Sequence, residues 1–78
     1  MSVQYRIAVA KKDERVDGPD GAEVVFTVPV AVVTTGDFDA TVEFMRGKLK
    51  AVGHTGRVLE LLASGEVDAA LSRLASQL

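Results

Sequence analysis

Cysteine and tryptophan are absent from this sequence, and histidine occurs once, as His54. Without cysteine there is no disulfide framework and no thiolate ligand, so a metal site would have to gather carboxylates around one imidazole. The same histidine would have to serve any catalytic triad, and Ser64, Ser72 and Ser76 do not lie in a nucleophile-elbow context. We therefore predict that the protein is not an enzyme and holds neither a metal nor a cofactor.

Long apolar runs and a strong excess of one charge are missing as well. No stretch approaches the roughly 18 to 20 apolar residues that a membrane-spanning helix needs, and the first residues lack the order of a signal peptide. The net charge of −2 gives no general attraction to nucleic acid. We expect one domain, residues 1–78, located in the cytoplasm. We also expect a homodimer rather than a monomer, because so short a chain has a marginal core.

Two segments in the first half of the chain show the patterns of β-strands. Val3–Ala10 alternates between two faces with period two, and Ala22–Val28 does the same. Between them, the charge run Lys11–Arg15 is interpreted as a solvated turn or a protected sheet edge, and Val16–Gly21 is dense in turn formers. We predict an antiparallel hairpin from Val3 to Val28.

The segment from Gly36 to Gly53, GDFDATVEFMRGKLKAVG, predicts a helix followed by a strand. Wound as a helix, Phe38, Val42 and Met45 share one face, and the helix is apolar around more than half its circumference. Gly47 is expected to end this helix in a left-handed conformation. The alternation after it predicts a third strand over residues 48–52, added to the same sheet.

Two further helices are expected after Gly53. The first begins at His54 and Thr55, with Thr55 as its N-cap, and ends at Ser64-Gly65. The second runs from Glu66 to Leu78 and is amphipathic. Its apolar stripe is interpreted as core packing, with a dimer or partner surface as the alternative; the stripe comprises Val67, Ala70, Leu71, Leu74, Ala75 and Leu78.

The Gly36 to Gly53 segment resembles the signature of the sterol carrier protein type-2 domain. The spacing between Gly36 and Gly47 and the run from Phe44 to Lys50, FMRGKLK, carry the resemblance, with weaker agreement upstream from Val24 and downstream to Leu62. In that family the segment forms part of the wall of an apolar tunnel for fatty acyl chains or sterols, and the domain carries lipid without chemistry.

The resemblance also implies a short helix over Pro29–Thr35, where the β-branched composition by itself favours a strand. The family's domain usually has an opening helix and further strands, for which this chain has no room. We therefore expect a domain shortened at its N-terminus. A shallow apolar groove, an enclosure completed by a second chain, and a structural module without ligand all stay open.

These observations together predict an α+β domain with an antiparallel-rich sheet of about three strands, covered on one face by helices. The predicted function is non-enzymatic binding or transfer of an apolar ligand, a fatty acyl chain, a sterol or a similar lipid, in a groove formed by helices on the sheet. The predicted lining residues are Phe26, Phe38, Val42, Phe44, Met45, Leu59 and Leu62.

Two alternatives to lipid binding are kept. One is a structural or dimerisation module without ligand. The other is a nucleic-acid clamp of the KH type through Gly53-His54-Thr55-Gly56, which is disfavoured because only Arg57 and the distant Lys48 and Lys50 supply positive charge. Those two lysines could also contact an acyl carboxylate, although solvated strand residues are the preferred interpretation.

Overall fold

The computed structural model describes residues 2–11, 13–34 and 38–77 of the chain. Within these residues it contains four strands and four helices, which confirms the expected α+β class. In chain order they are β1 (Val3–Ala10), β2 (Asp13–Asp17), β3 (Val24–Pro29), α1 (Val30–Val33), α2 (Ala40–Met45), β4 (Lys50–Val52), α3 (Thr55–Ser64) and α4 (Glu66–Ala75).

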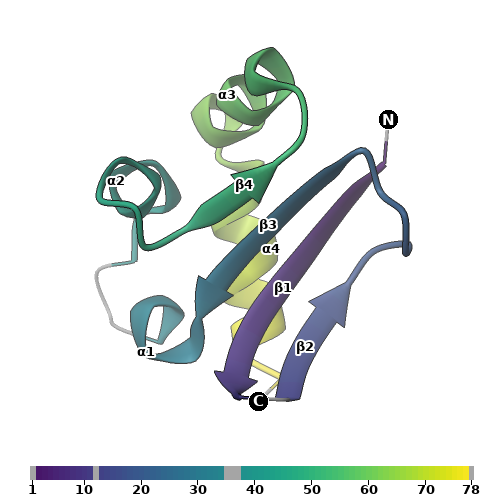
Figure 1. The fold of residues 1–78 in the computed structure, drawn as a ribbon. Coiled ribbons are helices and arrows are strands. Elements are labelled where there is room, and N and C mark those ends of the chain that lie inside the picture. Colours follow the sequence, from purple (N-terminus) through teal and green to yellow (C-terminus); the bar gives the residue numbers. More distant parts are fainter. Residues whose placement is uncertain (1, 12, 35–37, 78) are drawn as a thin grey trace.

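The sheet is mixed, with four strands in the order β2-β1-β3-β4 (Figure 1). β1 pairs antiparallel with β2 on one side and parallel with β3 on the other, and β4 pairs antiparallel with β3. The predicted antiparallel hairpin from Val3 to Val28 is therefore wrong, because β2 is inserted between its two strands along the chain. All five residues of β2 are exposed, so its sequence has no buried alternation that would reveal a strand. Its charges suit an edge that must not pair further.

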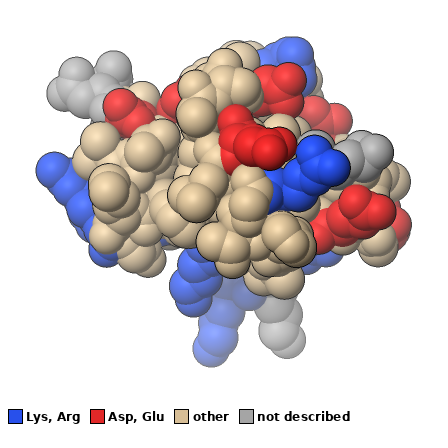
Figure 2. All heavy atoms as spheres, turned by 90° about the horizontal axis from the view of Figure 1, so that it is seen from above, with Lys and Arg blue, Asp and Glu red and all other residues tan. Residues whose placement is uncertain are grey.

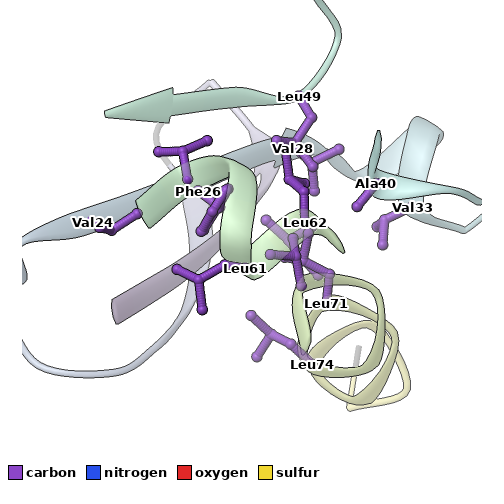
Figure 3. Packing of buried hydrophobic residues seen from close by; sticks show 13 residues of the cluster. Val24, Phe26, Val28, Val33, Ala40, Leu49, Leu61, Leu62, Leu71 and Leu74 are labelled. Carbon is purple, nitrogen blue, oxygen red and sulfur yellow. The ribbon is translucent and has the colours of Figure 1, made fainter. Parts of the chain in front are cut away.

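The helices cover one face of the sheet, and α4 passes behind the sheet in Figure 1. α4 contacts β1 and β2, α1 contacts β1 and β3, and α3 packs on both α4 and α2. Figure 3 shows the resulting core, in which Phe26 and Val28 of β3 face Leu61, Leu62 and Leu71 of the last two helices.

A polar side chain is buried on the other face of the sheet. Gln4 lies under the turn between β2 and β3, where its Nε2 donates to the Pro19 carbonyl and to Asp20 Oδ1, both at 3.2 Å. Its Oε1 accepts from Arg6 Nε at 2.6 Å, and Arg6 in turn pairs with Glu14 of β2 at 3.5 Å. This network holds the turn on the sheet and satisfies the buried amide.

The helix predicted over Pro29–Thr35 is confirmed for Val30–Val33, while Thr35 lies outside the described residues. Pro29 occupies the N-cap position with φ −66°, so its missing N–H costs the helix no hydrogen bond. Val33 is buried in the core. Tertiary burial and the proline together override the β-branched composition.

α2 is shorter than its apolar pattern suggests, because capping fixes its start at Ala40. Asp39 Oδ1 accepts from the amides of Thr41 at 3.0 Å and Val42 at 3.3 Å, and Asp68 Oδ1 of α4 accepts from the Ala40 amide at 2.6 Å. Gly36 and Asp37 lie outside the described residues.

The expected end of this helix at Gly47 is confirmed by its φ of 79°. The strand that follows starts two residues later than predicted, at Lys50. The amides of Lys48 and Leu49 bond instead to the Glu43 carbonyl at 2.9 Å and 3.1 Å, which leaves neither amide free for the sheet ladder.

α3 starts with His54 at the N-cap position, so the prediction of Thr55 as N-cap is wrong by one residue. Gly65 ends α3 as expected, with φ 81°. α4 buries its apolar stripe within the chain, which confirms the core-packing interpretation. Its buried members are Val67, Ala70, Leu71 and Leu74; Leu78 lies outside the described residues.

Tyr5 of β1 packs against the core. Its ring stacks on Phe26 with centroids 5.8 Å apart and an interplanar angle of 11°. The pKa of Tyr5 is raised above its ordinary value, first because burial disfavours the phenolate, and also because Glu66 and Asp17 repel it while Arg73 partly offsets them.

We expect the tyrosinate absorbance of the folded protein to appear at higher pH than that of the urea-unfolded protein. The pKa is raised only in the folded state. The folding stability that the neutral hydroxyl contributes is therefore fully present below the unfolded pKa of about 10. It is lost as the pH rises through the folded pKa. Tyr5 is the only tyrosine, so the titration has one source. Tyr5→Phe should lose less stability over this pH range, and equal absorbance midpoints in both states would contradict the argument.

Candidate apolar binding surface

The structure places the seven predicted lining residues at three depths. Phe26 and Leu62 are buried in the core. Phe38 and Phe44 are half-buried and pack against the core. The other three are exposed: Val42 by 38%, Leu59 by 53% and Met45 by 82%.

The exposed members come from two helices that contact each other, α2 and α3. We call Val42 and Met45 of α2 together with Leu59 of α3 the α2–α3 surface. It accounts for three of the five large hydrophobic side chains that are exposed in the described residues. The other two, Val16 and Val52, lie on strands. Three of the seven predicted lining residues are thus exposed apolar side chains.

The orientation of α2 explains why Val42 and Met45 face outward. Ala40 is fully buried, and its amide is tied to α4 by Asp68. With that residue held inward, Val42 is rotated by about 200° and Met45 by about 140° from it around the helix. Both side chains must therefore face away from the sheet.

The orientation of α3 likewise explains why Leu59 is exposed. Val58, Leu61 and Leu62 are buried and define the inner face of the helix. Leu59 follows Val58 by about 100° around the helix axis. This rotation puts it at the edge of the inner face, where it is half exposed.

Val52 does not belong to this surface. It is 69% exposed on β4, but its neighbour Ala51 packs against the core, so Val52 points to the opposite face of the sheet. The strand alternation could have revealed this exposed valine, yet the sequence analysis did not single it out. The bond from Asp68 to Ala40 was also missed, because it joins residues 28 positions apart and has no local pattern.

The potential metal ligands in the described part of the chain are dispersed. The described part of the chain contains no group of three or more His, Asp or Glu residues that could hold a metal ion. His54 is exposed at the start of α3. The charged neighbours form ordinary helix-surface pairs, Arg57 with Glu60 at 3.4 Å among them.

Gly53 of the possible nucleic-acid clamp has a packing role. A Cβ at this position would lie 2.7 Å from the Glu23 carbonyl oxygen and 3.1 Å from Val24 Cα. The glycine therefore lets the chain leaving β4 pass close to the start of β3. This contact accounts for the glycine without a phosphate ligand.

Comparison of the chain with protein-family models, curated proteins and solved structures finds no match. No helix in the described residues is long and apolar enough to cross a bilayer. The resemblance to the sterol carrier domain thus stays a prediction.

Proposed function

We propose that the protein binds or carries an apolar ligand, a fatty acyl chain or a sterol-like molecule, at the α2–α3 surface without catalysing a reaction. The observation that carries this proposal is the 82% exposure of Met45 on a helix that also exposes Val42 and packs on the helix carrying Leu59. Larger exposed apolar patches mark binding surfaces in soluble domains, and in this proposal the three side chains form one such patch. Methionine suits such a surface because its flexible thioether adapts to ligands of different shape.

The half-buried rings extend the apolar character inward from this surface. Phe44 lies on α2 between the exposed residues and the core, and Phe38 precedes the same helix. The buried Phe26 and Leu62 form the deepest layer. In this proposal a ligand contacts the exposed residues first, and reaches the deepest layer only if α2 and α3 move apart.

The apolar area that a ligand would cover at the surface sets an upper limit on its affinity. Covering a methionine, leucine or valine that is partly exposed contributes about 1 to 2 kcal/mol for each side chain. Three such side chains supply about 3 to 6 kcal/mol, and the ligand's own apolar area adds a similar amount. Association itself costs at least about 4 kcal/mol in lost translational and rotational freedom. The net is therefore at most about 8 kcal/mol, so the dissociation constant is expected to be micromolar or weaker.

Titration with a fluorescent fatty acid and with an uncharged fluorescent sterol analogue tests the proposal. We expect saturable binding of one of them, and Met45→Asp should weaken it at least about tenfold, because a carboxylate then replaces an apolar contact. Val16→Asp is the matched control, since Val16 is an exposed valine on β2 and should leave binding unchanged. Absence of binding by either probe across chain lengths would contradict the proposal.

A structural or dimerisation module is the second candidate, favoured by the same exposed side chains. The α4 stripe is covered within the chain, so in this alternative the homodimer uses the α2–α3 surface instead. Light scattering separates the two candidates. A dimer that Met45→Asp converts into a folded monomer, with no probe bound by the parent protein, would support the module.

A further inference from the structure

The face of the sheet that carries no helix is turned toward the viewer in Figure 1, with α4 behind it. Side chains of a strand alternate between the two faces, and Phe26 and Ala51 pack in the core under the helices. The residues next to them therefore point to the helix-free side. The pairing registers align one row of such side chains across β2, β1, β3 and β4, namely Val16, Arg6, Thr27 and Lys50. We call the side that carries this row the open sheet face.

Apolar side chains lie at both edges of the open sheet face. Val16 on β2 is 44% exposed, and Val52 on β4, which is aligned with Val25 of β3, is 69% exposed. They are the large exposed hydrophobic side chains of the described residues that lie outside the α2–α3 surface. A sheet face that meets only water usually presents polar side chains. The two valines favour a partner on this face, and the charges around them indicate which kind.

The charges on the open sheet face are of opposite sign at its two edges. Glu14 is aligned with Ala8 and lies at the β2 edge, whereas Lys50 lies at the β4 edge. Arg6 stands between them and is already bound, to Gln4 at 2.6 Å and to Glu14 at 3.5 Å. Lys50 is exposed and, among the described residues, has no ion-pair partner within 4.0 Å. An acidic edge thus lies opposite a basic edge on one sheet.

This balance of charge does not suit an anionic partner. Arg6 and Lys50 are offset by Glu14 and by Asp20, which accepts a hydrogen bond from Gln4 at the end of the face. Figure 2 shows that acidic and basic groups also lie side by side at the centre and right of the end seen from above. Nucleic acids and anionic bilayers attract clusters of basic residues instead. A surface that carries both signs at opposite edges complements a copy of itself.

We propose that the open sheet face binds the same face of a second copy, so that two sheets pack into a two-fold symmetric dimer. A two-fold axis parallel to the strands brings the β2 edge of one copy over the β4 edge of the other. Glu14 of each copy then meets Lys50 of the other. An axis across the strands would bring each edge over itself and place like charges together, so charge selects the first arrangement.

The turn that covers Gln4 gives a second complementarity with the same axis. Gln4, Val25 and Val52 share one row of the sheet, and the turn rises over the β1 end of that row through Pro19 and Asp20. An axis parallel to the strands keeps each row at its own level and exchanges the β1 side with the β3 side. The turn of each copy therefore comes to lie over Val25 and Val52 of the other and covers them.

The dimer leaves the α2–α3 surface free, because the helices cover the opposite face of the sheet. The inference is therefore independent of the proposed function. The face is four strands wide, about 19 Å at a strand spacing of about 4.8 Å. Contacts with so small a footprint are at the weak end of specific interfaces, so we expect a dimer that dissociates on dilution.

Light scattering over a series of protein concentrations tests the dimer. We expect the mass to rise from one chain to two as the concentration increases. Lys50→Glu places two acidic groups opposite each other and should weaken the dimer at least about tenfold. Arg57→Glu is the matched control, since it makes the same charge change at an exposed position of α3 and should leave the dimer unchanged.

A charge exchange locates the contact. Glu14→Lys should weaken the dimer as Lys50→Glu does, and the two changes together should recover most of the affinity. Within one chain three strand spacings, about 14 Å, separate β2 from β4, so recovery comes from contact between copies. Val52→Asp should also weaken the dimer, while circular dichroism shows whether each variant keeps its fold.

The proposal is overturned by a monomer at every concentration, by a dimer that Lys50→Glu leaves intact, or by a double variant that recovers nothing. A dimer that Met45→Asp dissociates would assign the contact to the α2–α3 surface and also overturn it. Probe titration reports the carrier proposal separately: a dimer without probe binding would remove the carrier proposal alone, and probe binding by a monomer would remove the dimer alone.

Discussion

Gly18→Ala is expected to cost about 3 to 5 kcal/mol of unfolding free energy. Gly18 has φ 114°, a conformation that side chains disfavour by about 1 to 3 kcal/mol. A Cβ there would lie 2.4 Å from the Val3 carbonyl oxygen and 2.9 Å from Gln4 Cα, so backbone must move. Forcing extra atoms into packed surroundings costs a further 1 to 3 kcal/mol, roughly. The turn that covers Gln4 would also shift, which would weaken the hydrogen bonds from the Gln4 amide to Pro19 and Asp20.

This loss is large for so short a chain, because total stability of about 0.05 to 0.15 kcal/mol per residue leaves roughly 4 to 12 kcal/mol. Urea unfolding followed by circular dichroism measures it. Gly21→Ala is the matched control in the same turn. Gly21 has φ 72° with nothing within 4 Å of an added Cβ, so only strain of about 1 to 2 kcal/mol is expected. Equal costs for the two variants would mean that the contact with β1 is not what requires Gly18.

Leu74→Glu is expected to unfold the protein. Leu74 is 5% exposed on α4 and belongs to the core cluster. The change removes about 1.5 to 3 kcal/mol of apolar burial. It also places a carboxylate in an apolar environment, where the group must either lose its charge or open the structure. The combined cost exceeds about 4 kcal/mol, which approaches the whole stability expected of this chain.

Leu59→Glu is the control, with the same substitution on the neighbouring helix at a side chain that is 53% exposed. It should keep its far-ultraviolet circular dichroism spectrum and lose about 1 kcal/mol or less. Sizing with light scattering completes the comparison. If Leu74→Glu instead ran as a folded monomer while the parent protein was a dimer, the α4 stripe would be a subunit contact and its burial within one chain would be contradicted.

Some elements of the fold could be predicted from local pattern alone. β1 was predicted over the residues it occupies, since alternation over Val3–Ala10 leaves one arrangement that separates apolar from polar side chains. The helix ends at Gly47 and Gly65 followed from the freedom of glycine, and the buried stripe of α4 followed from its helical period. The sequence predicted apolar lining residues for the candidate site but not which of them would be exposed, and the ligand site itself stays a prediction.

The tertiary structure decided which strands pair with each other and how deeply each apolar side chain is buried. The parallel pairing of β1 with β3 depends on β2, whose exposed residues carry no periodic signal, and on a turn that docks over Gln4. Which apolar residues face solvent depends on the rotation of α2, which Asp68 fixes from the other end of the chain. Periodicity determines local conformation and the faces of each element, because it acts between neighbouring residues. Strand partners and the rotation of a short helix depend on contacts between distant residues, so only the folded chain decides them.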